Sequence, residues 1–256
     1  MADLFSMKNR VVLLTGASRG LGRDMALTLA AAGATVLCAG RTVKGLEATA
    51  KAIMRQSHKT GGKAHVMPLD ITDEAAVREQ VATVIARHRR IDVLVNNAGI
   101  IYREAIVDTS TETFRSAIET DLVSQFMLAR EVGRHMLKRK YGRIVNISSV
   151  MAILGRASVA GYVAAKHGLV GLTKNLAVEF GPNVTANAIA PGYIRTELNV
   201  PLQQNKPFNA MLEQRTAAHR WGKPEDLRGP LLLLASDAGS YISGARIAVT
   251  GGRPIL

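Results

Sequence analysis

The sequence predicts an α/β fold in which helices cover both faces of a doubly wound sheet of seven mainly parallel strands. Two observations support this prediction. Short apolar runs alternate with longer helix-like segments through all 256 residues, and a glycine-rich turn at 16–22 directly follows the first run. The chain is 47% hydrophobic, and no linker, repeat or low-complexity run divides it. We therefore expect one domain over residues 1–256.

The first half of the chain predicts four strands. The apolar run 11–14 follows a basic residue and is typical of a buried first strand. After the glycine-rich turn we expect a helix through Ala32 that ends at Gly33. The remaining elements of this half are expected as strands at 34–39, 64–69 and 91–95 and as helices at about 43–55 and 74–87.

The second half continues the alternation. The helix that carries Tyr162 has leucines at intervals of three or four residues, a recurrence typical of helices. A last helix is expected to start at Pro224, because proline suits the first helical turn. The other elements of this half are expected as one long helix at about 111–139 and as strands at 144–147, 186–190 and 246–249.

The expected strand ends carry the residues with functional potential. Strands that alternate with helices imply parallel pairing with right-handed crossovers. In such sheets ligands bind beyond the carboxyl ends of the strands. The residues that stand at these ends are Gly16, Arg41, Asp70, Asn96, Ser149 and Pro191.

The turn after the first strand indicates a phosphate-binding site. Its glycines let the backbone approach a phosphate, and the helix that follows offers free N–H groups and the positive end of its dipole. The spacing is G-x-x-x-G-x-G rather than the commoner G-x-G-x-x-G. Because the turn comes directly after an N-terminal strand, it favours nucleotide binding.

Tyr162 and Lys166 indicate a catalytic pair. Helical positions four apart share a face, so the phenol and the ammonium should project together. A free tyrosine has a pKa of about 10 and is a poor base near neutrality. A cation nearby favours the phenolate, and such a pair could donate or accept a proton at a carbonyl or alcohol oxygen. The alternative is that the two side chains are ordinary surface neighbours.

The chain is strongly basic, with a formal net charge of +13. The basic clusters at 51–63, 87–90 and 134–143 come late in expected helices, where the helix dipole favours cations. Such a face could bind nucleic acid or an acidic partner. However, the clusters contain one aromatic residue, Tyr141, and no recognised nucleic-acid module, so solvated helix ends are favoured.

The lone cysteine and the apolar segments bear on location. Cys38 lies in an apolar run and is expected to be a buried small hydrophobe, because it has no partner for an internal disulfide. The first ten residues have no apolar h-region, and no uncharged apolar run is long enough to span a membrane. We expect a soluble protein of a reducing cytoplasm, with no metal site.

The chain resembles the short-chain dehydrogenase/reductase family. The resemblance covers nearly the whole chain in the family's order, and Ser149 precedes Tyr162 by 13 residues, as is common there. The matching residues are Thr15 to Gly22, Asp70, Asn96 to Gly99, Ser149, Tyr162 with Lys166, Pro191-Gly192 with Thr196, and the stretches 220–226 and 234–237.

This resemblance implies a Rossmann-type fold, a nicotinamide cofactor and hydride transfer to or from carbon. Tyr162 would be the general acid in carbonyl reduction and the base in alcohol oxidation. Ser149 would hydrogen-bond the substrate oxygen and stabilise developing charge. Lys166 would favour ionisation of Tyr162 and bind ribose hydroxyls.

The resemblance also implies a set of cofactor-binding residues. Asp70 with Ile71 would hold the adenine, 97–99 would line the adenosine side, and Ile194 with Thr196 would bind the carboxamide end. The alternatives are turn chemistry for Asp70 and Asn97, an ordinary loop serine for Ser149 and a helix cap for Thr196. The full set is Gly16, Ser18, Arg19, Gly20, Leu21, Gly22, Arg41, Asp70, Ile71, Asn97, Ala98, Gly99, Tyr162, Lys166, Pro191, Gly192, Ile194 and Thr196.

The end of the second strand predicts NADP rather than NAD. NAD-specific sites place a carboxylate there for the ribose 2′-hydroxyl, but this chain has Gly40, which leaves space for a 2′-phosphate. In the family, basic residues at the positions of Arg41 and Arg19 accompany NADP, and their guanidinium groups could bind the phosphate. The alternative is that Arg41 only starts a loop and Arg19 faces water.

One residue departs from the family's catalytic set. Asp121 stands where the family usually has the asparagine of a proton-relay tetrad. That asparagine acts largely through its main-chain carbonyl and a water, so the role survives a change of side chain. The added carboxylate near Lys166 could alter the local pKa values.

The substrate is expected to be a ketone or secondary alcohol. Arg103 and Arg156 lie on loops beside the expected site, and a guanidinium suits a carboxylate, although both could be solvated surface arginines. The stretches 155–160 and 208–216, within and near a substrate-loop region at about 193–220, are similar to gluconate 5-dehydrogenases. The overall pattern also resembles 3-oxoacyl-[acyl-carrier-protein] reductases. A homotetramer is implied by the family, and a catalytically weak cofactor-binding scaffold is the remaining alternative.

Overall fold

The computed structural model describes residues 4–57 and 60–253. Within these residues one sheet has the strand order β3-β2-β1-β4-β5-β6-β7, and every neighbouring pair is parallel. The doubly wound parallel sheet predicted from the sequence is confirmed. The strands are β1 (Val11–Thr15), β2 (Thr35–Gly40), β3 (Lys63–Pro68), β4 (Val93–Asn96), β5 (Gly142–Ile147), β6 (Val184–Pro191) and β7 (Arg246–Val249).

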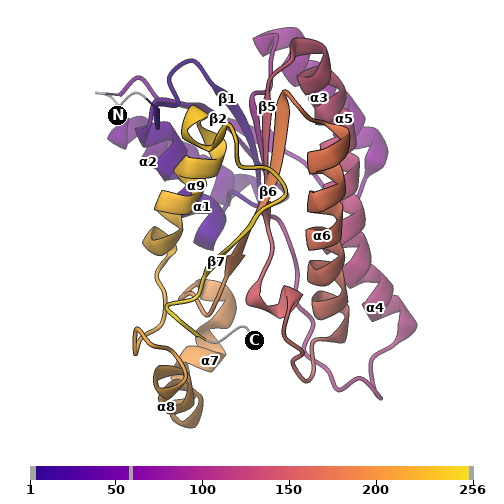
Figure 1. Cartoon of the computed structure of the whole chain (residues 1–256), viewed down its shortest axis with the longest axis vertical. Helices are drawn as coiled ribbons and strands as arrows, with labels where there is room; N and C mark the ends of the chain where they lie inside the picture. Colours follow the sequence, from indigo (N-terminus) through magenta and orange to yellow (C-terminus); the bar gives the residue numbers. More distant parts are fainter. Residues whose placement is uncertain (1–3, 58–59, 254–256) are drawn as a thin grey trace.

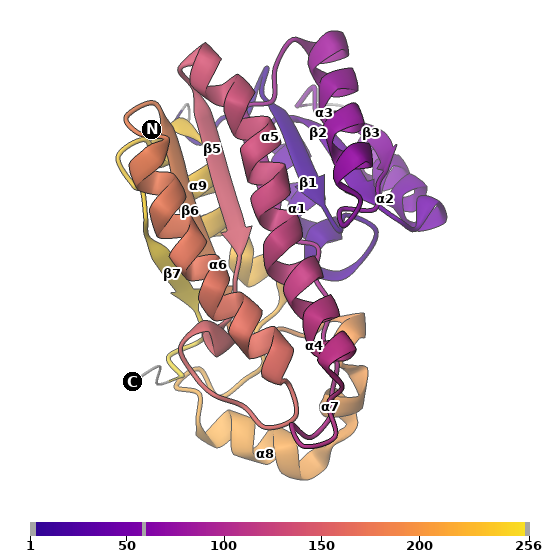
Figure 2. The ribbon, with the colours of Figure 1, turned by 90° about the vertical axis from the view of Figure 1, so that its right-hand side faces the viewer.

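Helices cover both faces of this sheet (Figure 1). Two short helices, α7 and α8, lie apart from these layers, beyond the carboxyl ends of the strands, as Figures 1 and 2 both show. One face carries α1 (Gly20–Ala31), α2 (Val43–Gln56) and α9 (Arg228–Ala235). The other face carries α3 (Glu74–His88), α5 (Ser124–Arg139) and α6 (Ala160–Glu179), with α4 (Thr111–Ile118) in line with α5; the short helices are α7 (Val200–Gln204) and α8 (Lys206–Gln214).

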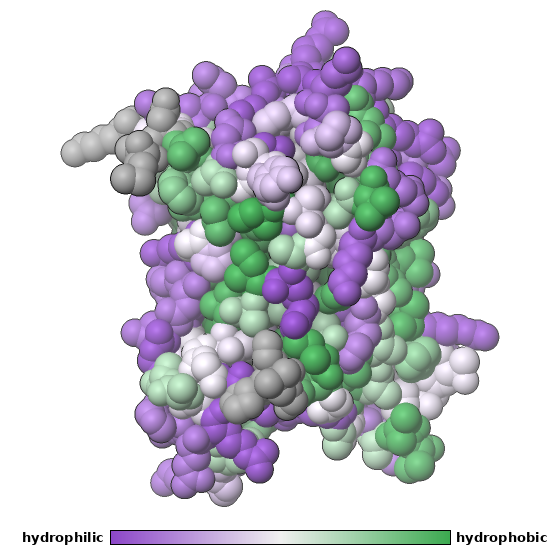
Figure 3. All heavy atoms as spheres, in the orientation of Figure 1, coloured by the Kyte–Doolittle hydropathy of each residue, from purple (hydrophilic) through white to green (hydrophobic). Residues whose placement is uncertain are grey.

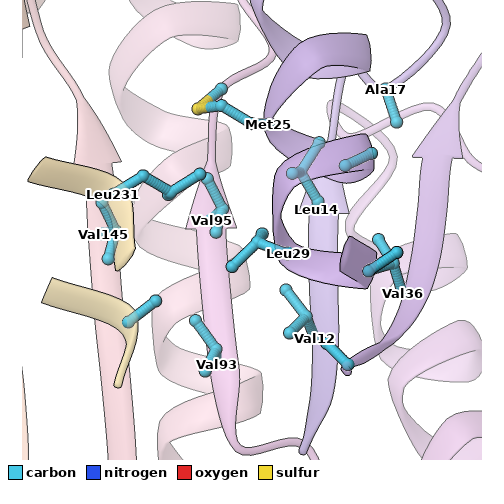
Figure 4. Close-up of a cluster of buried hydrophobic side chains, with 14 of the residues drawn as sticks. Val12, Leu14, Ala17, Met25, Leu29, Val36, Val93, Val95, Val145 and Leu231 are labelled. Carbon is cyan, nitrogen blue, oxygen red and sulfur yellow. The ribbon is translucent and has the colours of Figure 1, made fainter. Parts of the chain in front are cut away.

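The hydrophobic core lies on both sides of the sheet. In β1 successive side chains point to opposite faces, so Val12 and Leu14 pack with Met25 and Leu29 of α1 (Figure 4), whereas Leu13 belongs to the cluster on the other face. Since both faces are covered, every residue of β1 is buried. This explains why the strand is a continuous apolar run instead of an alternating one.

The long helix predicted at 111–139 is interrupted. A π-helical turn, Glu119–Val123, separates α4 from α5. In this turn the carbonyl oxygen of Thr120 accepts hydrogen bonds from the Ser124 hydroxyl at 2.5 Å and from the Gln125 side chain at 3.2 Å. These side chains compete with the regular backbone ladder, which explains a break that apolar spacing could not reveal. Turns of this kind are frequent at functional sites.

The other predicted boundaries differ by small amounts. The third strand begins at Lys63, the fourth begins at Val93 and extends to Asn96, and the fifth and sixth are longer than predicted. Pairing with the neighbouring strand sets these ends: Lys63, for example, pairs with Thr35. The helix predicted from Pro224 begins as a short 3-10 turn before α9.

The basic clusters lie late in α2, α3 and α5 or just beyond them. Those of α3 and α5 lie at the end of the molecule away from α7 and α8, where Figure 3 shows many hydrophilic side chains. His58 and Lys59 of the first cluster, and the first three residues of the N-terminus, lie outside the described residues. Cys38 is buried in β2, and burial raises the pKa of its thiol to about 12. Among the described helices, none has both the length and the apolar character needed to cross a membrane.

Candidate active site

A cavity of about 380 Å³ lies along the carboxyl ends of the strands. It passes the point where the strand order reverses, between β1 and β4, which is where open α/β sheets bind ligands. The structure brings the residues predicted to be catalytic, cofactor-binding or substrate-binding together here. The strand-end residue Asn96 is not part of the lining: it is buried and donates to the Asn146 side chain at 2.9 Å. The lining includes Gly16, Ser18, Arg19, Gly20, Leu21, Gly22, Arg41, Asp70, Ile71, Asn97, Ala98, Gly99, Arg103, Asp121, Ser149, Arg156, Tyr162, Lys166, Pro191, Gly192, Ile194 and Thr196.

The glycine-rich turn joins β1 to α1 and has no room for a side chain at Gly16 or Gly22. Gly16 has φ +69°, and a Cβ on Gly22 would lie only 2.1 Å from the Gly16 carbonyl oxygen. The residue before α1, Arg19, is extended and makes no side-chain cap. The first N–H groups of α1 therefore remain available to the cavity, which suits a phosphate.

The end of β4 is tied to this turn. The Asn97 side chain donates to the carbonyl oxygens of Thr15 at 2.9 Å and Gly16 at 3.3 Å. In return the Thr15 hydroxyl oxygen accepts the N–H groups of Asn97 and Ala98, both at 3.0 Å. Asn97 thus lines the cavity and also joins the end of β4 to the glycine-rich turn, so the hydrogen bonding expected of a turn residue is present as well.

The end of β2 is open and basic. A Cβ on Gly40 would have no neighbour nearer than Leu46 Cδ2, at 3.6 Å, so this place has room. Arg41 is 72% exposed, and its guanidinium lies 4.0 Å from an Asp70 carboxylate oxygen. Hydrogen bonds from the Thr72 N–H and hydroxyl, with a smaller contribution from Arg41, lower the pKa of Asp70. Asp70 therefore makes the side-chain hydrogen bonds to Thr72 that are typical of a turn, and it also lines the cavity.

Tyr162, Lys166 and Ser149 converge on the opposite wall. Lys166 Nζ lies 5.5 Å from the centre of the Tyr162 ring and donates to the Ile147 carbonyl oxygen at 3.1 Å. Ser149 stands at the start of a 3-10 turn, where its Oγ accepts the Met151 N–H at 3.1 Å. One helix face and one strand end thus hold a phenol, an ammonium and a hydroxyl around one space.

Asp121 lies directly behind this group. The π-helical turn places it in the interior, where one carboxylate oxygen accepts the Ile100 N–H at 2.8 Å and the other lies 3.3 Å from Lys166 Nζ. Burial acts to lower the pKa of Lys166, but the charges of Asp121 and Tyr162 outweigh it, and the pKa of this lysine is raised.

Positive charge gathers at the other end of the cavity. The Arg156 guanidinium is hydrogen-bonded to the Tyr193 hydroxyl and lies 5.3 Å from the ring centres of Tyr193 and Phe208. Burial, together with the charges of Arg103 and Arg253, lowers the pKa of Arg156. Among the described residues, no carboxylate pairs with Arg103 or Arg156. This region can therefore receive an anion.

Comparison with known proteins identifies the family. A family model described as enoyl-(acyl carrier protein) reductase matches residues 16–253. The chain belongs to the short-chain dehydrogenase/reductase family. It is 38% identical to the 2-dehydro-3-deoxy-D-gluconate 5-dehydrogenase of Formosa agariphila, over 98% of this chain and 94% of that protein. It is 35% identical to the 3-oxoacyl-[acyl-carrier-protein] reductase of Escherichia coli, over 96% of this chain and 98% of that protein.

A solved structure is similar over nearly the same length. The gluconate 5-dehydrogenase from Burkholderia cenocepacia, in complex with NADP and tartrate, superposes with a TM-score of 0.92 at 35% identity, and the match covers 98% of this chain and 97% of that chain. As a short-chain dehydrogenase/reductase, the present protein is an oxidoreductase that acts on CH-OH groups with a nicotinamide cofactor.

Tyr193, which lines this short-chain dehydrogenase/reductase site, and Arg253, which lines a neighbouring pocket, were missed in the sequence. Tyr193 packs edge-on against Trp221, with ring centres 5.8 Å apart, and against Phe208 at 5.3 Å. The Arg253 guanidinium lies 4.9 Å from the Tyr193 ring centre. Both residues follow the carboxyl ends of strands, β6 and β7, and this position is the signal that could have found them.

The segment beyond β6 covers the cavity of this family member. Ile194 forms an isolated parallel bridge with Gly222, which closes the segment that contains α7 and α8. Thr196 starts a 3-10 turn, and its N–H donates to the Asn199 side chain at 3.1 Å while the residue lines the cavity. Within the described residues, no three His, Cys, Asp or Glu side chains are placed to hold a metal ion.

Proposed function

We propose that this enzyme is an NADP-dependent dehydrogenase that interconverts a ketone and a secondary alcohol on a sugar acid such as 5-ketogluconate and gluconate. The observation that carries the substrate class is the pair of arginines, Arg103 and Arg156, in the same cavity as Tyr162 with no carboxylate partner among the described residues. Relatives at 37–38% identity named gluconate 5-dehydrogenase and 2-dehydro-3-deoxy-D-gluconate 5-dehydrogenase support it.

The cofactor assignment rests on the chain's own geometry. The free N–H groups of α1 and the absence of side chains at Gly16 and Gly22 fit a pyrophosphate. Arg41 and Arg19 would bind the 2′-phosphate in the open space beside Gly40. NADP in three related solved structures supports this choice.

The remaining residues proposed to contact the cofactor also line the cavity. Asp70 and Ile71 would hold the adenine, and the stretch 97–99 would line the adenosine side. Ile194 and Thr196, on the segment beyond Pro191-Gly192, would bind the carboxamide end and so orient the nicotinamide ring. When bound, the cofactor supplies or accepts the hydride at the substrate carbon.

The side chains move the proton that balances this hydride. In reduction, Tyr162 would donate its hydroxyl proton to the carbonyl oxygen as the new C–H bond forms; in oxidation the phenolate would accept the alcohol proton. The Ser149 hydroxyl would hydrogen-bond the same oxygen and stabilise its charge. Lys166, fixed by the Ile147 carbonyl, would bind ribose hydroxyls and favour the phenolate.

A 3-oxoacyl-[acyl-carrier-protein] reductase is the second candidate, because relatives of that name match at 35% identity. A substrate panel with NADPH separates the two. We expect reduction of 5-ketogluconate or similar keto acids, with little turnover of acetoacetyl thioesters. The reverse pattern would establish the acyl reductase, and no turnover with any ketone would favour a cofactor-binding scaffold.

We also propose a homotetramer in the cytoplasm. Large apolar side chains stay exposed on the helices that the family uses for assembly: Phe114 on α4, Phe126 on α5 and Val178 on α6. The single, buried cysteine fits a reducing compartment. Light scattering coupled to size-exclusion chromatography should give four times the chain mass of 27.4 kDa.

A further inference from the structure

A buried carboxylate lies against the lysine of the active site. Asp121 is fully buried and Lys166 is 4% exposed. One Asp121 oxygen accepts the Ile100 N–H, but the other has no hydrogen-bond partner among the described residues, and the nearest ammonium is Lys166 Nζ at 3.3 Å. A neutral amide at this position would leave the lysine with no counter-ion.

We propose that Asp121 is a positioning residue that acts through Lys166: its carboxylate holds the ammonium in place and offsets part of the positive field that reaches the Tyr162 hydroxyl. The inference rests on the proposed roles of Tyr162 and Lys166 and deepens them. It assigns to this residue a task that the uncharged asparagine cannot perform.

The physical argument is the sum of two opposite charges. An ammonium 5.5 Å from the centre of the Tyr162 ring favours the phenolate, and a carboxylate oxygen 3.3 Å from that ammonium opposes it. Because the pair is buried, water screens these fields less than at the surface. Removal of the Asp121 charge should therefore leave Tyr162 beside an uncompensated ammonium, a change that favours the phenolate.

The groups around the pair define what a variant changes. Lys166 is faced by Asp121 from the π-helical turn, by Tyr162 from its own helix α6 and by the Ile147 carbonyl from β5. Replacement of Asp121 by asparagine removes one charge and leaves these neighbours in place. The unmodified protein and the Asp121→Asn variant share the other charged side chains along the cavity: Arg19, Arg41, Asp70, Arg103, Arg156 and Glu197.

The test is the pH profile of Asp121→Asn, measured as kcat/KM in both directions with NADP(H). Alcohol oxidation needs the phenolate, so its acidic limb should move to lower pH by about one unit, a tenfold gain below the limb. The alkaline limb of ketone reduction, which needs the phenol, should move the same way. Loss of packing alone would lower the rates without displacing the limbs.

A second measurement does not depend on turnover. The near-ultraviolet absorbance of ionised phenol is titrated in the NADP⁺ complex, and the signal lost in Tyr162→Phe is assigned to Tyr162. This signal should ionise at lower pH in Asp121→Asn. If the unmodified protein reduces no keto acid, the proposed substrate fails, whereas the absorbance titration still tests the role of Asp121.

Asp92→Asn is the matched control. Asp92 is also a buried carboxylate with a cationic partner, Arg90, but it stands just before β4, at the amino end of the sheet. This variant should be less stable yet keep both pH limbs. An unchanged profile in Asp121→Asn, or a limb that moves upward, would overturn the proposal. If Asp121→Asn does not fold, Asp121→Ser makes the same charge change and should give the same displacement.

Discussion

The cofactor side and the substrate side of this cavity are built in different ways. The cofactor side consists of the turn between β1 and α1 and the ends of β2 and β4, where backbone geometry does most of the work: a Cβ on Gly22 would meet the Gly16 carbonyl at 2.1 Å. The substrate side consists of side chains from distant segments, among them Arg103, Arg156 and Tyr193. The cofactor side follows from residue spacing within short stretches of the chain. The substrate side depends on how segments that are remote in the sequence fold together.

The largest expected effect is at Tyr162, where the two sides meet. Tyr162→Phe removes the proton carrier, so kcat should fall at least about a hundredfold while NADPH affinity, measured by fluorescence titration, stays nearly intact. Tyr141→Phe is the control. Tyr141 stands just before β5, at the amino end of the sheet, and its hydroxyl donates to Asp237, so its loss should not change kcat. Near-normal turnover by Tyr162→Phe would sink the catalytic assignment.

The cofactor side should be intolerant of a single methyl group. Gly22→Ala places a Cβ against the Gly16 carbonyl and displaces the turn, so the Kd for NADPH should rise by roughly thirtyfold or more. Gly171→Ala is the matched control, since a Cβ on that α6 glycine meets nothing within 4 Å. An unaltered Kd for Gly22→Ala, measured by calorimetry, would show that backbone closeness does not govern this side.

Charge at the end of β2 should set the choice of cofactor. We expect at least about a tenfold preference for NADPH over NADH in kcat/KM, and Arg41→Ala should remove most of it. Gly40→Asp should turn the preference towards NADH, because its carboxylate would accept a hydrogen bond from the ribose 2′-hydroxyl and repel a 2′-phosphate. The variant should also be less stable, since Gly40 has φ +159°. Equal use of both cofactors by the unmodified protein would refute this interpretation.

The substrate side should respond to the charge of the substrate. Arg156→Ala removes a guanidinium that faces the cavity, so KM for a keto acid should rise about tenfold with kcat less affected. An uncharged ketone of similar size serves as the control and should keep its KM. If both substrates weaken alike, Arg156 supports Tyr193 and does not bind the carboxylate.

The contrast also explains what could be predicted from the sequence. The alternation of strands and helices, the glycine-rich turn and the shared face of Tyr162 and Lys166 follow from spacing along the chain, and the structure shows each of them. The order of the strands in the sheet was not predicted. Strand ends differ by one or two residues because partners such as Thr35 and Lys63 decide where a ladder stops. Local pattern therefore predicts the elements of the sheet and the position of the glycine-rich turn.

The rest arises from contacts between segments that are remote in the sequence. The π-helical turn at Glu119–Val123 depends on side-chain bonds from Ser124 and Gln125 to one carbonyl, which apolar periodicity does not encode. The cluster of Tyr193, Phe208 and Trp221 forms only when the segment beyond β6 folds back. The direct contact of Asp121 with Lys166 likewise required coordinates, although its place in the motif was visible.

The rate at which a reagent labels the buried Cys38 thiol can report how often the sheet opens around β2. A thiol whose pKa is raised to about 12 has almost no thiolate at neutral pH, and its place in the middle of β2 keeps reagents away. A thiol-specific reagent can therefore modify it only in the rare moments when the sheet separates, so the rate of labelling counts those moments. Since this is the chain's single cysteine, no second thiol confuses the count. A ligand that binds the folded form should slow the labelling in proportion to how strongly it holds the sheet closed.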